Sequence, residues 1–166
     1  MAIQAAVRYN RKVAFAGRSV VQNIEAATKC GYIKIPAGTL IDIKQVNRYK
    51  PNQVAIIIAG SQGQEGSAMQ RLAAGEHQFL KLKANDHVVI SVDAIPGTEG
   101  SVNGLIDTLY KQDVRVSYSG STPGLHVSGH GHRGDLALLA RLVKPKNIIP
   151  MGGNIRHMYV YRELAL

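Results

Sequence analysis

The chain has 166 residues, 45% of them hydrophobic, which suits one domain, or a domain and a half, with a substantial core. Its 20 Lys and Arg outnumber its 11 Asp and Glu, giving a net charge of +9, and no apolar run is long enough to cross a membrane. The single cysteine, Cys30, excludes an internal disulfide and a cysteine-rich zinc site, and we expect a cytoplasmic protein with no membrane partner.

Strand-like and helix-like segments alternate along the chain. In order, the pattern predicts a helix over 3–9, a strand over 12–16, a helix over 20–30, strands over 32–35 and 54–59, a helix over 65–74, strands over 78–82 and 87–92, a helix over 102–111, a strand over 114–117, a helix over 136–143, a strand over 147–150 and a helix over 154–166. Ser19 is expected to cap the helix that Gly31 ends. The alternation predicts an α/β fold, a mostly parallel sheet with flanking helices.

The positive charge is concentrated near the two ends of the sequence. Residues 1–50 carry nine Lys and Arg against two acids, residues 51–132 carry five against seven, and residues 133–166 carry six against two. This distribution suggests a polyanionic partner, RNA or DNA, although a merely basic soluble protein would show the same surplus. With no Trp and two Phe, contacts to nucleic acid should be mainly to phosphate.

Three loops share one design, with small or polar residues between a predicted strand and a helix. They cover residues 16–19, 59–63 and 95–99. Free N–H groups at helix N-termini attract anions, and in parallel sheets such loops gather at the carboxyl ends of the strands. The three loops together indicate a phosphate-binding edge, although each alone reads as ordinary turn chemistry. None fits GxxxxGK[ST] or GxGxxG, so a nucleotide-binding motif is not supported.

The segment from His126 to His132 (HVSGHGH) places three imidazoles, a hydroxyl and two glycines within seven residues. Its HxHxxD pattern, ending at Asp135, is a near miss to the HxHxDH zinc motif, and no other histidine has motif spacing, so an independent two-metal site is not supported. His132 is read as a solvated loop residue. His126 and His130, with Ser128 between them, are better candidates, because a histidine beside a hydroxyl can hold phosphate or donate a proton.

A series of short motifs, taken in order, resembles the β-CASP family of metallo-β-lactamase-fold nucleases, and within it ribonuclease J. The matching pieces are RKVAF at 11–15, GRS at 17–19, Asn23, GSQG at 60–63, RLA at 71–73, Gly75, His77, IPG at 95–97, Glu99, HVSGHG at 126–131, KPK at 144–146 and IP at 149–150. The resemblance implies a β-CASP domain over residues 1–124, followed over residues 125–166 by the C-terminal part of a metallo-β-lactamase domain.

The resemblance also implies a function and the residues that perform it. Such enzymes hydrolyse RNA, as 5′-to-3′ exonucleases that prefer a 5′-monophosphate and as endonucleases, and use two metal ions, usually zinc, to activate the attacking water. Carried over by position, His130 is the expected proton donor. Phosphate or RNA contacts are expected from Arg18, Ser19, Ser61, Gln62, Gly63, His126, Ser128 and Gly129.

Two departures from the family pattern bear on activity. The HxHxDH segment is missing, and Gly152 occupies the position expected for a metal-ligand histidine. The first hypothesis is therefore an RNA-binding, catalytic portion, weak or inactive alone, that binds no metal itself and takes its metal ligands from a missing segment or a partner chain. The second is a non-catalytic RNA-binding or assembly module. An unrelated phosphate-binding protein would not explain the ordered motifs. Exposed apolar surface left by a missing half would favour homo-oligomers.

Overall fold

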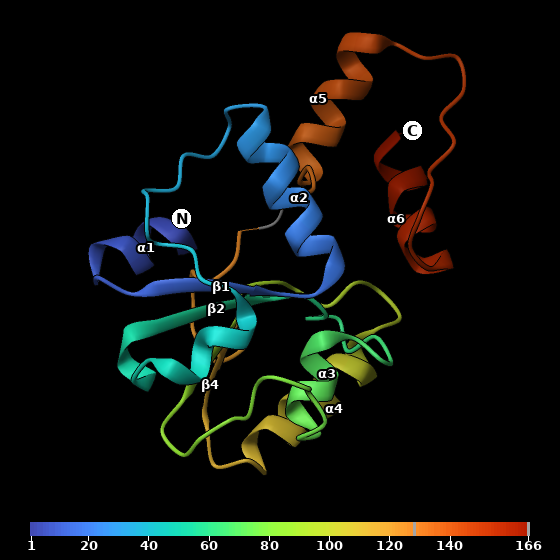
Figure 1. The fold of residues 1–166 in the computed structure, drawn as a ribbon. Coiled ribbons are helices and arrows are strands. Elements are labelled where there is room, and N and C mark those ends of the chain that lie inside the picture. Colours follow the sequence, from blue (N-terminus) through green and yellow to red (C-terminus); the bar gives the residue numbers. More distant parts are fainter. Residues whose placement is uncertain (128, 166) are drawn as a thin grey trace.

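The computed structural model describes residues 1–127 and 129–165, which form a mixed α/β fold (Figure 1). The elements in chain order are α1 (Ala2–Arg8), β1 (Lys12–Ala16), α2 (Arg18–Lys29), the 3₁₀ helices η1 (Ile43–Arg48) and η2 (Pro51–Gln53), β2 (Val54–Ile58), α3 (Ala68–Ala73), β3 (His87–Ile90), α4 (Glu99–Tyr110), β4 (Arg115–Tyr118), α5 (Arg133–Val143) and α6 (Ile155–Ala165). The predicted fold class is therefore confirmed. The predicted strand over 12–16 matches β1 at both ends, and the bounds of the other elements that form differ by at most three residues.

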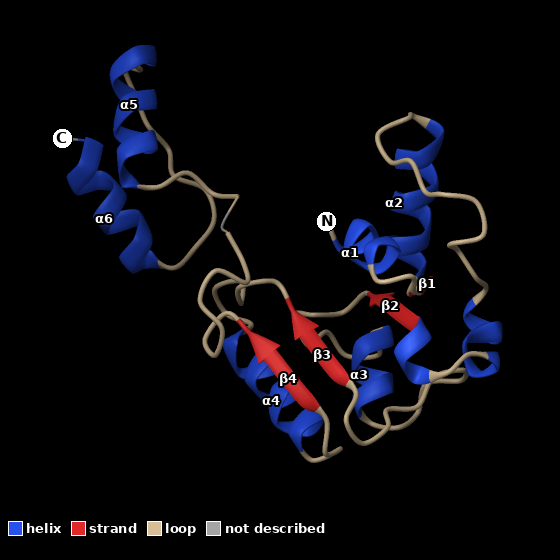
Figure 2. Cartoon of the chain, turned by 90° about the vertical axis from the view of Figure 1, so that its left-hand side faces the viewer, coloured by secondary structure: helices blue, strands red, loops and turns tan. Residues whose placement is uncertain are grey.

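The parallel strands form two separate pairs rather than one ladder. β1 pairs with β2, Lys12 opposite Val54, and β3 pairs with β4, His87 opposite Arg115. The arrows of β2, β3 and β4 point the same way in Figure 2, so the carboxyl ends of both pairs lie on one side of the molecule. α1 and α2 lie above β1 and β2, whereas α3 and α4 lie below them (Figure 1).

The described residues 32–35, 78–82 and 147–150 form no strand, so three sequence predictions were wrong. The N–H groups of Tyr32 and Ile33 bond to the carbonyl of Ala27, which holds this segment against the last turn of α2. The N–H groups of Phe79 and Leu80 bond to Nδ1 of His77, so a side chain takes the donors that a ladder would use. Within 147–150, Ile149 is 83% exposed, and the structure describes no strand beside it.

The helix caps also differ in one place from the sequence prediction. Gly17, not Ser19, is the N-cap of α2, because the chain leaves β1 with φ of 108° at Gly17 and turns directly into the helix. Ser67 caps α3 in the expected chemical manner, since its hydroxyl oxygen accepts the N–H of Gln70 at 3.2 Å.

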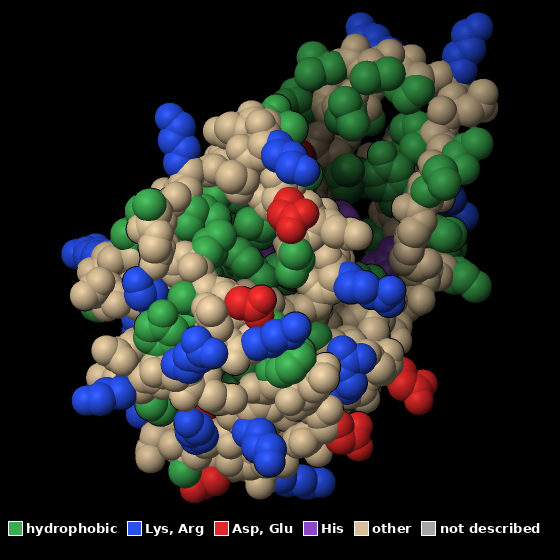
Figure 3. All heavy atoms as spheres, in the orientation of Figure 1, with side chains coloured by type: hydrophobic (Ala, Val, Ile, Leu, Met, Phe, Trp, Pro, Cys, Tyr) green, Lys and Arg blue, Asp and Glu red, His purple; other side chains and the backbone are tan. Residues whose placement is uncertain are grey.

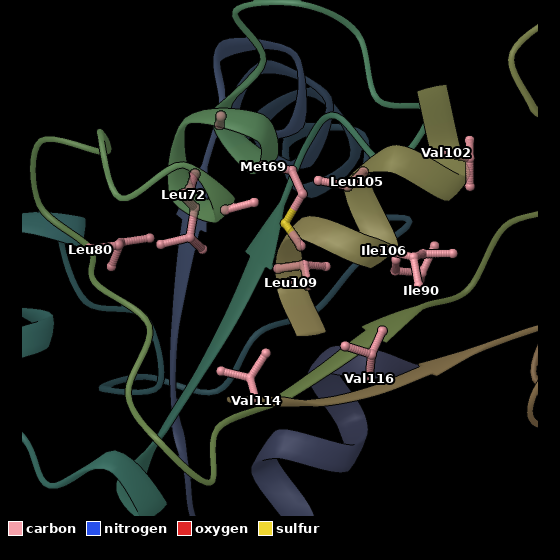
Figure 4. Packing of buried hydrophobic residues seen from close by; sticks show 13 residues of the cluster. Met69, Leu72, Leu80, Ile90, Val102, Leu105, Ile106, Leu109, Val114 and Val116 are labelled. Carbon is pink, nitrogen blue, oxygen red and sulfur yellow. The ribbon is translucent and has the colours of Figure 1, made fainter. Parts of the chain in front are cut away.

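The core lies between the β3–β4 pair and the helices α3 and α4. Figure 4 shows Met69, Leu72, Leu105, Ile106 and Leu109 converging from these helices on strand residues. α5 and α6 have no buried residue among those described and stand away from this body (Figure 2). In the described part of the chain, the helices are too short and too polar to cross a bilayer.

Leu109 gives a direct test of the core, because its side chain is fully buried. We expect Leu109→Ala to lower the free energy of unfolding by about 2–5 kcal/mol, since it removes apolar contacts and leaves a cavity. Leu142→Ala is the matched control, because Leu142 is 73% exposed on α5 and should lose less than about 0.5 kcal/mol. Urea unfolding followed by circular dichroism measures both, and equal losses would contradict this assignment of the core.

Candidate phosphate-binding site at the carboxyl ends of the strands

The first two strand-end loops lie directly against each other. β1 is followed by Gly17 and β2 by Ala59 and Gly60, and both glycines have φ of 108°. A side chain on Gly17 would place its Cβ 2.8 Å from that of Ala59, so the backbones approach more closely than any larger residue allows. The predicted juxtaposition of these loops at one sheet edge is therefore what the structure shows.

Gln62 ties the second loop to the third. Its Oε1 accepts hydrogen bonds from the N–H of Ile95 at 3.0 Å and from the hydroxyl of Thr98 at 2.8 Å. Its Nε2 donates to the carbonyl of Asp93 at 2.8 Å. Both polar atoms of the side chain are thus engaged within the protein, and Gln62 shapes the edge by holding residues 93–98 in place.

Gly63 packs against the first turn of α4. It has φ of 69°, and a Cβ there would collide with the carbonyl oxygen of Ser101. In the same turn, Oε2 of Glu99 accepts the N–H of Gly97 at 2.7 Å. Hydrogen bonds from the backbone of Glu99 and Gly97 lower the pKa of Glu99, and the charges of Arg156 and His157 lower it further, so the carboxylate stays ionised.

His126 is anchored to the loop that follows β3. Its Nδ1 lies 3.1 Å from the carbonyl oxygen of Ser91, so this nitrogen carries the proton, while Nε2 lies 3.8 Å from Oδ2 of Asp93. The hydroxyl of Ser91 donates to the carbonyl of Leu125 at 2.9 Å. The histidine segment therefore begins at the same edge as the Gln62 loop, and Asp93 contacts both.

The rest of the histidine segment leads into α5. Gly129 and His130 are exposed, and Ser128 lies outside the described residues. His132 is the N-cap of α5, and its N–H donates to Oδ2 of Asp135 at 2.8 Å. In this structure the HxHxxD spacing forms a capping box at the start of α5.

Arg18 and Ser19 are exposed in the first turn of α2. The N–H of Val21 is the first of this helix to bond back, to the carbonyl of Gly17 at 3.2 Å. The N-terminal turn of α2 therefore adds backbone donors and the positive end of the helix dipole to the edge that carries the Gln62 loop.

Sequence reasoning missed the residues that assemble this edge. Ser91 and Asp93 were not singled out, and Thr98 was included only as part of the 95–99 loop, yet each holds a site segment through a hydrogen bond. A sequence signal for Ser91 and Asp93 was available, since they are polar residues just after β3, where ligand-side groups gather in parallel sheets. Which loop each would hold depends on contacts between residues about 30 positions apart, and no local pattern encodes these.

The described residues contain no group of three or more His, Cys, Asp or Glu placed to hold a metal ion. Gly152, at the position where a ligand histidine is expected, lines a cavity of about 530 Å³ between α5 and α6 instead. Apolar residues form most of the cavity wall, including Leu136, Met151, Met158 and Leu164.

Comparison with known proteins finds matches to one family along nearly the whole chain. The model of the ribonuclease J β-CASP domain matches residues 1–109, and that of the Zn-dependent metallo-hydrolase RNA specificity domain matches residues 122–166. Ribonuclease J of Helicobacter pylori strain B128 is 39% identical over 165 residues, which are 99% of this chain and 24% of the relative. Ribonuclease J of Corynebacterium glutamicum is 39% identical over 99% of this chain and 23% of its own length. Ribonuclease J 1 of Streptococcus pyogenes serotype M3 is 37% identical over 99% of this chain and 29% of its own length. The chain thus spans about a quarter of these relatives.

Gln62→Ala tests the hydrogen bonds that join the two loops. We expect faster hydrogen exchange at the N–H of Ile95, because that donor loses its acceptor on Gln62. The fully buried core residue Leu109, in α4, should keep its protection. Unchanged exchange at Ile95, measured by NMR, would show that the loop holds its shape without Gln62.

His77 makes the stability of the chain depend on pH. Burial lowers the pKa of His77 below its ordinary value of 6.5, and the charge of Arg71 lowers it further. The unfolded chain therefore binds more protons below about pH 6.5, and stability should fall as the pH drops through this range. We expect the unfolding temperature of the wild type to drop more between pH 7.5 and 5.5 than that of His77→Gln, measured by calorimetry. Equal drops would contradict this role.

Proposed function

Because the chain belongs to the ribonuclease J β-CASP family, we propose that it is the RNA-phosphate-binding portion of a metal-dependent RNA hydrolase. We further propose that residues 1–124 form the β-CASP domain and that residues 125–166 are the C-terminal part of a metallo-β-lactamase domain. The observation that carries the proposal is the convergence of the Gln62 loop, the 93–98 loop and His126 at one edge.

This edge suits the phosphates of a single strand of RNA. Gly60 and Gly63 let their loop pack closely against Ser67 and Ser101, and the N-terminal turn of α2 presents amide donors beside Arg18 and Ser19. Ser61, Gly63, Gly129, His126 and Ser128 complete the proposed contacts. Gln62 contributes by positioning, since its side chain is engaged. We propose that a 5′-monophosphorylated strand is preferred, for exonucleolytic or endonucleolytic cleavage.

We propose His130 as the catalytic histidine. In hydrolysis, water attacks phosphorus and the bond to the 3′ oxygen breaks, so the leaving oxygen needs a proton. An imidazolium at His130 can donate it, and its exposed position before α5 leaves it accessible to RNA.

We propose that zinc, which the name of the matched specificity domain includes, is not held by this chain alone. The described residues offer no cluster of ligands, and Gly152 has no side chain to bind with. We propose that the complete enzyme holds two zinc ions, which supply an activated water when bound. Their ligands would come from a metallo-β-lactamase half outside these 166 residues, in the same or another chain.

The apolar surface of α5 and α6 supports such a partner. Leu139, Leu142 and Val143 on α5 and Ile155 on α6 are more than half exposed, and hydrophobic side chains cover this region in Figure 3. Surfaces of this kind are normally covered by another part of an assembly. We propose that the metal-binding half covers it, that the assembly forms homo-oligomers, and that it acts in the cytoplasm.

The test is degradation of a labelled, 5′-monophosphorylated RNA with zinc or manganese. We expect the chain alone to bind the RNA and to cleave it weakly or not at all. Combined with the metal-binding half of a ribonuclease J, it should cleave, and His130→Ala should lower the rate by roughly 10²- to 10⁴-fold with binding retained.

Three outcomes would contradict the proposal. Robust zinc-dependent turnover by the isolated chain would show that the ligands need not come from elsewhere. A reconstituted enzyme that His130→Ala leaves fully active would remove the catalytic role. A reconstituted complex that binds RNA without cleaving it, with or without the substitution, would favour the non-catalytic module, which Gly152 and the missing HxHxDH segment also motivate.

A further inference from the structure

The positive charge of the strand region is not located at the proposed site. For each strand we define a carboxyl-end window of five residues, which runs from the last strand residue into the following loop. The four windows are 16–20, 58–62, 90–94 and 118–122. Together these contain one Arg and one Asp. For each strand we likewise define an amino-end window of five residues, which ends at the first strand residue. The four windows are 8–12, 50–54, 83–87 and 111–115. Together these contain seven Lys and Arg against two Asp.

We define these seven residues as the amino-end surface; they are Arg8, Arg11, Lys12, Lys50, Lys83, Lys111 and Arg115. All but the half-buried Lys12 are exposed. The parallel pairing of β1 with β2 and of β3 with β4 brings these strand starts to one side, opposite the carboxyl ends (Figure 2).

The register strengthens this grouping at the first pair. Lys12 lies opposite Val54, and the guanidinium of Arg11 reaches the carbonyl of Val54 at 3.5 Å. Lys50 stands four residues before Val54, at the N-cap of η2. The two Asp in these windows precede β3 and β4, and Asp86 is partly engaged, since its carboxylate accepts the N–H of Lys83 at 2.9 Å. A net surplus of five positive charges therefore faces one side of the molecule.

We propose that the amino-end surface is a second contact for the RNA backbone, independent of sequence and remote from the phosphate-binding edge. A strand of five residues is about 16 Å long, so one nucleotide cannot reach both surfaces. The surplus of positive charge on this surface matches contact with phosphates. The proposal rests on the proposed function for its ligand, and adds that a long strand is held on the far side of the sheets.

The experiment is a salt titration of binding to a fluorescent 30-nucleotide single-stranded RNA. One variant removes one positive charge per strand: Arg8→Gln, Lys50→Gln, Lys83→Gln and Lys111→Gln. The control variant removes the same charge elsewhere: Lys29→Gln, Lys34→Gln, Arg141→Gln and Lys146→Gln. We expect the slope of log affinity against log salt to fall by about 3 in the first variant, since each lost contact to a single strand contributes roughly 0.7. The control should keep most of the wild-type slope.

A further variant separates this proposal from the proposed function. In a His126→Ala, His130→Ala background, the four amino-end substitutions should lower the slope by the same amount, because the two surfaces act independently. An unchanged slope in the amino-end variant, or an equal loss in the control, would overturn the second contact. Unchanged affinity in the His126→Ala, His130→Ala protein would count against the site at the carboxyl ends while leaving the amino-end result readable. Circular dichroism of each variant confirms that it is folded.

Discussion

Two pairs of parallel strands that share no hydrogen-bond ladder need another means of keeping their loops aligned. In this chain, the means is Gln62, which follows β2 and bonds to Asp93, Ile95 and Thr98, all of which follow β3. The buried cluster from α3 and α4 brings the pairs together but does not specify how their loops meet. The side-chain amide of Gln62 determines how these loops meet, because it accepts hydrogen bonds from two donors and donates one to a carbonyl in a defined arrangement.

The same constraint explains why so few charged groups are needed at the candidate site. Loops that are already positioned can present N–H groups and glycine backbone to a phosphate without ordering them on binding, which lowers the cost of association. His126 fits this arrangement, since its Nδ1 is held by the carbonyl of Ser91 and its orientation is set before any ligand arrives. Asp93 joins the two systems through its backbone carbonyl and its carboxylate.

Sequence patterns identified the elements whose reasons are local. Val54–Ile58 has β-branched residues at four of its five positions, and Gly17 marks the start of a helix even though Ser19 looked the better cap. Residues 78–82 misled because Leu80 and Leu82 pack against the core from a loop, where alternation of burial mimics a strand. The motifs located the candidate site, but the contacts of Asp93, Ser91 and Thr98 join residues far apart in sequence, and such contacts depend on the completed packing.

The distribution of charge separates two tasks that a polyanion imposes on a protein. Attraction over distance depends on net charge, and around the strands the surplus of positive charge lies at their amino ends. In the proposed binding mode, placement of a single phosphate depends on directional donors, which the N-terminal turn of α2 would offer at the nearly neutral carboxyl ends. A strongly basic carboxyl edge would bind phosphates in many registers, whereas a neutral edge with fixed donors selects one. The helix direction supports the same division, since α2 and α4 begin at the carboxyl edge and turn the positive ends of their dipoles toward it.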